Sequence, residues 1–470
     1  MKGLHLTFMI LAIMVVFNSC GTGEKGDKKG VANNTHFTGA KGEVKLITLD
    51  PGHFHAALVQ KNMYDQINSE VFVYAPKGSD VDGHVKRVLD YNARIEKPTS
   101  WFEKVYRGGD YLEKMLSEKK GNVVVVSGNN RIKTDYIKKS VEAGFNVLAD
   151  KPMVITHEQF PLLEEAFKKA KENGVLLYDI MTERFSITTI LQRELAMVPE
   201  IFGNLEPGTP EKPAIEMISL HYFYKNVSGN VLVRPGWFFD VNQQGEGIVD
   251  VTTHLVDLVQ WECFPDQVLQ KSDVQIIFAK RWPTMFSKEE FKEVTHLEQY
   301  PPYLSSAIKD EKLNVFANGE IVYKLKGAVA KVTAIWNYKA AEGAGDTHYS
   351  IMRGSLSTLE IRQGIEEKYD PTLYITSGKG VNPDIFHTNL DKIVKRLPQA
   401  GLTIQNVNKN TWKVIIPVEL KVGHEAHFAQ VTAKYLEYLK VGKLPEWEVP
   451  NMITKYFTTT SALKVAKVDE

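Results

Sequence analysis

Cysteine is nearly absent from this chain of 470 residues, which contains only Cys20 and Cys263. Cys20 follows an apolar N-terminal segment, where we expect it to be modified. Cys263 would then have no partner for an internal disulfide, even in an oxidising compartment. The folded state must therefore be stabilised by packing.

The chain also lacks an excess of charge of either sign. Lys and Arg total 57, Asp and Glu total 57, and the formal net charge is +0. Proteins that bind nucleic acids usually carry a basic excess or a basic patch, so we expect no nucleic-acid partner. The length favours two or three domains, and 43% hydrophobic residues are enough for a large core.

Long hydrophobic runs are missing after the first twenty residues. Lys2 and the apolar run "LTFMILAIMVVF" (6–17) have the layout of a signal peptide and are short for a membrane span. The following "NSCG" resembles a bacterial lipoprotein signal, with Cys20 as the lipidated residue. An ordinary signal peptide with an incidental cysteine, or a short anchor helix, are the alternatives.

A polar tether rich in Gly, Lys and Asn follows over 21–42. No twin-arginine pair is present, so export would proceed unfolded through the general pathway. We expect an exported protein held at a bacterial membrane, on the periplasmic side or the cell surface, only through its lipid anchor.

From residue 43 to 182, short β-rich runs alternate with longer amphipathic stretches. "NVVVVSG" (122–128) and "FNVLADKP" (145–152) are typical of buried strands, and "HEQFPLLEEAFKKAKENG" (157–174) is typical of a helix that ends at glycine. This alternation predicts βαβ units and an α/β, doubly wound parallel sheet with helices on both faces. Residues 183–470 contain runs of hairpin-like strands, which predict a separate α+β domain with a large, open, mostly antiparallel sheet.

Glycine is scarce at the first strand-to-helix junction, "ITLDPGHFHAAL" (47–58), where a nucleotide-binding loop is usually rich in it. This loop has one glycine, Gly52, and two histidines, His53 and His55. A zinc site needs three or four ligands. No cysteine cluster or HExxH motif supplies the others, and "GHEAHF" (423–428) is far away in the sequence. We expect no metal here.

Two further motifs carry candidate chemistry. Asp150-Lys151-Pro152 ends a predicted strand, and ligands of doubly wound folds lie outside the carboxyl ends of the strands. In "GEGIVDVTTHLVDL" (245–258), Asp250 and His254 are four residues apart and would share one face of a helix, as suits an acid/base pair. The alternative is a structural histidine satisfied by its neighbour. Asp257 lies off that face and is interpreted as structural.

From about residue 43 onward the chain resembles the Gfo/Idh/MocA oxidoreductases, which pair a Rossmann domain with an open-faced β-sheet domain. The resemblance rests on "VVVVSGNN…YIKKSVEAGFNVLADKP", "ERF" (183–185), "FGNL" (202–205) and "RPGWFFD…GEGIVDVTTHLVDLVQW". Asp150 stands where the family usually has glutamate.

The resemblance implies a site. Lys151 would hydrogen-bond the reacting hydroxyl beside a nicotinamide ring of NAD or NADP, His254 would be its acid/base partner, and Asp250 would position the substrate or the histidine. Substrates would be sugars, polyols or glycosides, and Arg184 and Trp237 would contact them together with Asp250. The residues expected to contact the cofactor are Gly52, His53, Phe54, Lys77, Asn129, Asn130, Asp150 and Lys151.

The first loop departs from the family's pattern. "DPGHFHA" (50–56) keeps only one glycine of G-x-G-x-x-G, and the second predicted strand ends at Ala75, Pro76 and Lys77 rather than at an acid. The N-terminus of the following helix is still expected to attract a phosphate, and Lys77 could favour the 2′-phosphate of NADP. We therefore interpret the loop as a diverged cofactor loop rather than a metal site.

Two functions stay open at this point. One is an oxidoreductase-family enzyme that acts on a carbohydrate, favoured by the Lys151, Asp250 and His254 set. The other is a non-catalytic carbohydrate-binding lipoprotein that retains the fold, favoured by the degraded glycine loop. The strands around "AVAKVTAIWNYKA" (328–340) predict a homo-oligomer formed through the open sheet.

Overall fold

The computed structural model describes residues 37–227, 230–341 and 343–469. The predicted signal peptide, Cys20 and most of the tether lie outside these residues. Among the described residues, no helix combines the length and the hydropathy that a membrane span requires.

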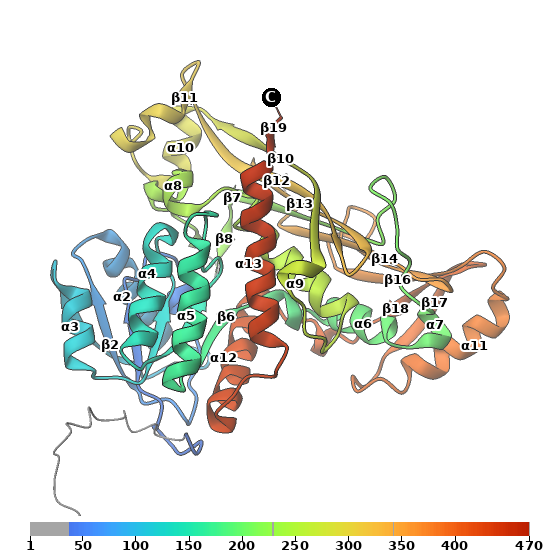
Figure 1. The fold of residues 1–470 in the computed structure, drawn as a ribbon, viewed down its shortest axis with the longest axis horizontal. Helices are drawn as coiled ribbons and strands as arrows, with labels where there is room; N and C mark the ends of the chain where they lie inside the picture. The colour runs from blue at the N-terminus through green and yellow to red at the C-terminus, as the bar shows by residue number, and fades with distance from the viewer. Residues whose placement is uncertain (1–36, 228–229, 342, 470) are drawn as a thin grey trace, which may run out of the picture. The chain divides into compact units, whose positions relative to one another are not determined.

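The first half of the chain forms a six-stranded parallel sheet in the order β3-β2-β1-β4-β5-β6 (Figure 1). Strand β4 is fully buried, which explains its run of four valines. The doubly wound sheet predicted from the sequence is confirmed. Its strands are β1 Leu46–Leu49, β2 Glu70–Ala75, β3 Phe102–Arg107, β4 Val123–Val126, β5 Asn146–Asp150 and β6 Leu177–Ile180.

The helices of this half follow the strands, but the first is much shorter than predicted. The apolar run that follows "DPGH" (50–53) is the segment expected to begin a helix at the strand-to-helix junction, and only one turn forms there. Residues 55–60 are all buried, so the segment lacks the polar face of an amphipathic helix. The helices are α1 His55–Leu58, α2 Ser79–Ala93, α3 Tyr111–Glu118, α4 Asn130–Glu142 and α5 Phe160–Asn173.

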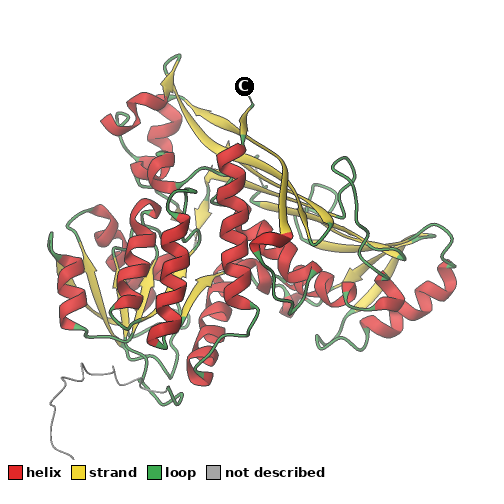
Figure 2. Cartoon of the chain, in the orientation of Figure 1, coloured by secondary structure: helices red, strands yellow, loops and turns green. Residues whose placement is uncertain are grey.

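The second sheet has eleven strands and is mixed but largely antiparallel, as predicted (Figure 2). Its main path is β17-β18-β16-β15-β14-β7-β13-β12-β10-β19, and β11 pairs with β12. The pairs β7–β13 and β10–β19 are parallel. The strands are β7 Ile215–Tyr224, β10 Val274–Phe286, β11 Ile308–Lys309, β12 Lys312–Leu325, β13 Ala328–Lys339, β14 Thr347–Arg353, β15 Ser357–Arg362, β16 Thr372–Ser377, β17 Thr403–Asn408, β18 Thr411–Ile415 and β19 Lys467–Val468, with a separate two-stranded ribbon of β8 Asn226–Val227 and β9 Asn230–Val231.

Helices and short 3-10 turns connect and cover this sheet. The α-helices are α6 Ile187–Ala196, α7 Pro199–Phe202, α8 Val241–Gln244, α9 Thr252–Cys263, α10 Lys288–Thr295, α11 Pro383–Val394, α12 His424–Val441 and α13 Glu448–Val465. The 3-10 turns are η1 Thr182–Phe185, η2 Gly236–Phe239, η3 Lys271–Asp273, η4 Pro302–Ala307 and η5 Val418–Leu420.

The last two helices return to the first half of the chain. Figure 1 shows α13 running between the two sheets, and α12 lies beside β6. Tyr435 of α12 stacks on Tyr178 of β6 with ring centroids 6.1 Å apart. Met452 and Tyr456 of α13 are fully buried in the same core as β1, β4 and β5. The core of the parallel sheet is therefore completed by C-terminal residues.

Candidate active site

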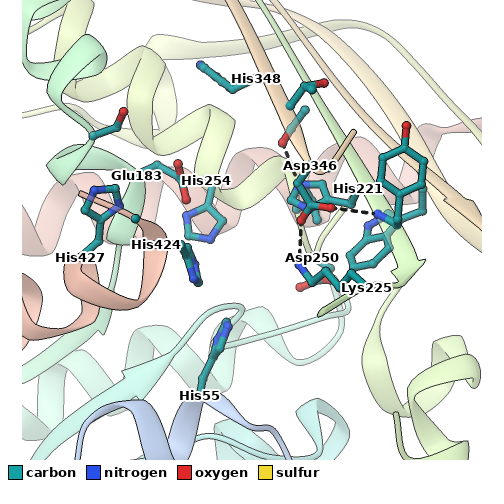
Figure 3. A pocket seen from close by; sticks show the side chains of 18 of the residues that line it. His55, Glu183, His221, Lys225, Asp250, His254, Asp346, His348, His424 and His427 are labelled. Carbon is teal, nitrogen blue, oxygen red and sulfur yellow. Dashed lines mark hydrogen bonds and ion pairs between the residues drawn. The ribbon is translucent and has the colours of Figure 1, made fainter. Parts of the chain in front are cut away.

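A cavity of about 860 Å³ lies where the parallel sheet meets the second half of the chain. Its walls come from the loop after β1, the end of β5, the turn before α9, strands β7 and β14, and the start of α12. Most of the side chains that point into it are imidazoles, carboxylates, amines and aromatic rings (Figure 3). A cavity of this size with convergent polar groups is suited to a polar small molecule.

Lys151 and Asp250 form an ion pair in this cavity. The Lys151 Nζ atom donates to Asp250 Oδ1 over 2.5 Å, and the two side chains are 12% and 7% exposed. Gln244 donates its amide to Asp250 Oδ2 over 3.2 Å. The structure thus places Lys151 at the carboxyl end of β5, as predicted, with a partner 99 residues away.

His254 also lines the cavity, but not as the partner of Asp250. Helix α9 begins at Thr252, so Asp250 lies in the preceding turn rather than one helical turn before His254. Asp250 bonds to Lys151 and Gln244 instead, and the expectation that it orients His254 is wrong.

The environment of His254 keeps its imidazole neutral. Its Nδ1 atom is buried and has no hydrogen-bond partner among the described residues. Burial, and then the charge of Lys151, hold the pKa of His254 well below its usual range. A neutral imidazole with a free lone pair can accept a proton from a substrate.

A second polar cluster surrounds Asp346 in the same cavity. His221 Nδ1 lies 3.0 Å from Asp346 Oδ2, and Lys225 Nζ donates to the same oxygen over 2.7 Å. Burial acts to raise the pKa of Asp346, but His221 and Lys225 outweigh it and keep the carboxyl ionised. His221 stacks on Trp336, which adds an aromatic face to the wall.

The loop after β1 brings its histidines to the end of β5. His55 Nδ1 lies 3.0 Å from Asp150 Oδ2, and His53 Nδ1 lies 3.7 Å from the same oxygen. Ser127 donates its hydroxyl to this oxygen over 2.8 Å. Gly128 permits the close approach of the loop, since a Cβ there would lie 2.2 Å from the carbonyl oxygen of Asp50.

Arg184, which was predicted to contact the substrate, does not line the cavity. Arg184 is buried and bonds to Asp257 through two nitrogens at 2.6 and 2.7 Å and to Glu448 at 2.8 Å. Asp257 also accepts from Lys455 over 2.8 Å, which confirms the structural interpretation of Asp257.

Other predicted residues also lie outside the cavity. Trp237 donates its indole N–H to Asp80 over 2.8 Å rather than facing the cavity. Asn129 caps α4 and donates to Gln243 over 2.7 Å. Lys77 is exposed, and neither it nor Gly52 lines the cavity.

The structure therefore brings together about half of the predicted site. The predicted residues that line the cavity are His53, Phe54, Asn130, Asp150, Lys151, Asp250 and His254. Most of the residues that line the cavity from the second half of the chain were not predicted from the sequence. Among them are the ionisable residues Glu183, His221, Lys225, Asp346, His348, His424 and His427. Only "GHEAHF" gave a visible signal, and its distance in the sequence hid its position.

Comparison with known proteins connects this geometry to a family. Residues 191–467 match the family described as "Putative oxidoreductase C terminal domain", and residues 80–179 match "Oxidoreductase family, NAD-binding Rossmann fold". A crystal structure of a "putative oxidoreductase" from Parabacteroides merdae is 56% identical, with 92% of this chain and 99% of that chain covered and a TM-score of 0.89. The chain belongs to the Gfo/Idh/MocA oxidoreductase family.

More distant Gfo/Idh/MocA structures share the fold. A 3-ketoreductase, KijD10 from Actinomadura kijaniata, in complex with NADP and TDP-benzene, is 11% identical over 90% of this chain and 98% of that chain, with a TM-score of 0.54. Levoglucosan dehydrogenase in complex with NADH and levoglucosan is 11% identical over 90% and 98%, with a TM-score of 0.56. A search of curated proteins found no match.

The loop after β1 in this Gfo/Idh/MocA protein does not fit a dinucleotide phosphate. Helix α1 is a single turn and offers no extended N-terminus. Asp50 is mostly buried at the loop, and burial raises the pKa of its carboxyl, which accepts from Tyr136 over 2.8 Å. A Cβ on Gly52 would lie 3.1 Å from both Asp80 and Trp237. Two carboxyl groups and an indole thus lie against this loop, a surrounding that does not suit an anionic phosphate.

Proposed function

We propose that this protein is an enzyme of the oxidoreductase family that acts on a sugar, polyol or glycoside bound in the 860 Å³ cavity. The observation that carries the proposal is the meeting of the Lys151–Asp250 pair and the neutral His254 in one polar and aromatic cavity. One structure of this fold is named a levoglucosan dehydrogenase, which supports a carbohydrate substrate.

The proposed roles follow from charge and protonation state. His254 is the base that accepts a proton from a substrate hydroxyl, because burial and the charge of Lys151 keep its imidazole unprotonated at neutral pH. The Lys151 ammonium stabilises the negative charge that develops on that oxygen. Asp250 positions Lys151 and supplies the counter-charge. Trp336 and Phe238 provide flat apolar faces of the kind that pack against sugar rings.

The test is a turnover assay of the purified wild type on a panel of sugars, polyols and aryl glycosides. Each substrate is assayed alone, with NAD and with NADP, which also tests the nicotinamide expected from the sequence. We expect conversion of at least one substrate, and a loss on the order of 10²–10⁴-fold in His254→Asn.

A carbohydrate-binding protein without activity is the second candidate, and the loop that does not fit a dinucleotide favours it. This candidate predicts saturable sugar binding in calorimetry with no conversion of any substrate, with or without a nucleotide. That outcome would overturn the enzyme proposal.

A further inference from the structure

The end of β5 carries a group of side chains that the proposed proton transfer does not use. His53, His55 and Asp150 each present one ligand atom, and these atoms lie within 4.8 Å of one another. Two imidazole nitrogens and one carboxylate oxygen are a donor set of zinc and of other divalent transition metals. The sequence argued against a metal because the loop offered only two ligands, and the structure supplies Asp150 as the third.

The separations of the nitrogens from the carboxylate oxygen lie on either side of the value for a metal site. Bonds of about 2.0–2.1 Å in a tetrahedral site place neighbouring ligand atoms about 3.3 Å apart. The carboxylate oxygen of Asp150 lies 3.0 Å from His55 Nδ1 and 3.7 Å from His53 Nδ1. Shifts of a few tenths of an ångström would bring both nitrogens to the ideal separation from this oxygen.

The carboxylate of Asp150 also has a hydrogen-bond partner outside the group of three side chains. Ser127 fixes the carboxylate from outside the group, as outer partners of metal ligands commonly do.

All three residues line the cavity, so a bound ion would keep a side open to a substrate. His424, at the start of α12, lies next to this side with its ring centroid 5.5 Å from that of His55 (Figure 3). We propose that His53, His55 and Asp150 bind one divalent transition-metal ion of the zinc class, with a coordination position open to the cavity. The ion would polarise a substrate oxygen in the same cavity as Lys151, and this role rests on the proposed function. The binding of the ion does not rest on it.

The test measures binding without reference to activity. Full-length protein without a polyhistidine tag is stripped with a chelator, incubated with Zn²⁺ or Co²⁺ and desalted, and its metal content is measured by mass spectrometry. We expect one ion per chain, d–d absorption bands of protein-bound Co²⁺, and no displacement by excess Mg²⁺ or Ca²⁺, which prefer all-oxygen ligands.

Variants locate the ion. His53→Asn, His55→Asn and Asp150→Asn should each weaken Zn²⁺ binding more than about 100-fold, because loss of a partner outside the ligands already costs about 10–100-fold. Ser127→Ala removes such an outer partner and should weaken Zn²⁺ binding by about 10–100-fold. His348→Asn removes an imidazole from another wall of the same cavity and should leave binding unchanged. Circular dichroism confirms the fold of each variant, and Ser127→Ala keeps the test valid if a ligand variant fails to fold.

Two results would overturn the proposal. One is the absence of stoichiometric Zn²⁺ or Co²⁺ binding by the wild type. The other is stoichiometric binding that His53→Asn, His55→Asn and Ser127→Ala all leave unchanged, which would place the ion elsewhere.

Discussion

At the scale of single residues, the cavity contains pairs of ionisable side chains in which the charge of one side chain affects the protonation state of the other. Lys151 keeps Asp250 compensated, and its charge also helps to keep His254 neutral. Such pairs contribute little net stability when intact, but breaking one leaves a buried charge without compensation. Substitutions at the site should therefore affect folding as well as activity.

Lys151→Met tests this coupling. The variant leaves the Asp250 carboxylate buried and unpaired, so its free energy of unfolding should fall by about 3–5 kcal/mol. The double variant Lys151→Met/Asp250→Asn also removes the charge of the unpaired carboxylate, so it should recover most of the lost free energy of unfolding. Its turnover should stay about 10²–10⁴-fold below that of the wild type. Urea unfolding and turnover are measured on both. Equal stability of the single variant and the wild type would show that the pair does not form.

Acid sensitivity should follow from the buried histidines. Burial lowers the pKa of His427 to about 4, against about 6.5 in an unfolded chain. Between these values the unfolded state binds a proton that the folded state does not. The contribution of His427 to the free energy of unfolding is therefore fully present above about pH 6.5. It falls as the pH drops to 4, by up to about 3 kcal/mol. Thermal melts from pH 7 to pH 4 should show a smaller loss in His427→Leu than in the wild type.

At the scale of elements, a buried ion network joins η1, α9 and α13. Arg184 of η1 bonds to Asp257 of α9 and Glu448 of α13, and Lys455 of α13 bonds to Asp257 and lies 2.7 Å from Asp179 of β6. These residues are almost fully buried. The network fixes the helix that carries His254 relative to the end of the parallel sheet.

Arg184→Met should therefore be a stability variant. It leaves Asp257 and Glu448 short of positive charge, and we expect a loss of about 3–5 kcal/mol in the free energy of unfolding with little change in substrate KM. Arg362→Met removes an arginine of a half-exposed pair with Glu360 and should cost less than about 1 kcal/mol. A raised KM with unchanged stability would restore the substrate role expected from the sequence.

The sequence predicted those elements whose pattern is local. The four valines of β4 and the periodic helix α5 have burial patterns visible in a short window. The roles of individual residues were less accessible, because they depend on distant partners. Arg184 meets Glu448 264 residues away, and Asp150 meets His55 95 residues away. A motif locates such a residue but does not reveal what it faces.

At the scale of the whole molecule, the location and the assembly of the protein are still proposals. We propose that Cys20 is lipidated and anchors the exported protein to a membrane. Cys20→Ala should move the protein from the membrane pellet to the soluble fraction, as followed by immunoblotting after cell fractionation. Retention of the variant in the pellet with an uncleaved N-terminus would contradict the lipoprotein proposal.

We also propose a homo-oligomer formed through the eleven-stranded sheet, in the region of β13. Charged residues lie on this part of the sheet, where Lys331 is within 3.3 Å of Glu216 and 3.4 Å of Glu320. Light scattering at micromolar concentration should give at least twice the mass of one chain. Lys331→Glu introduces like charges beside both acids and should shift the equilibrium toward the monomer.

Because α12 and α13 return to the parallel sheet, the core of this sheet can be completed only after both helices have been synthesised. The ribosome makes β1 to β6 first, yet the apolar surface that Tyr435, Met452 and Tyr456 cover stays open until α12 and α13 have been added. A chain without these two helices thus exposes an unfinished core, which delays stable folding until both have been made. In the exported lipoprotein that we propose, this late closure would keep the chain unfolded while it is threaded across the membrane.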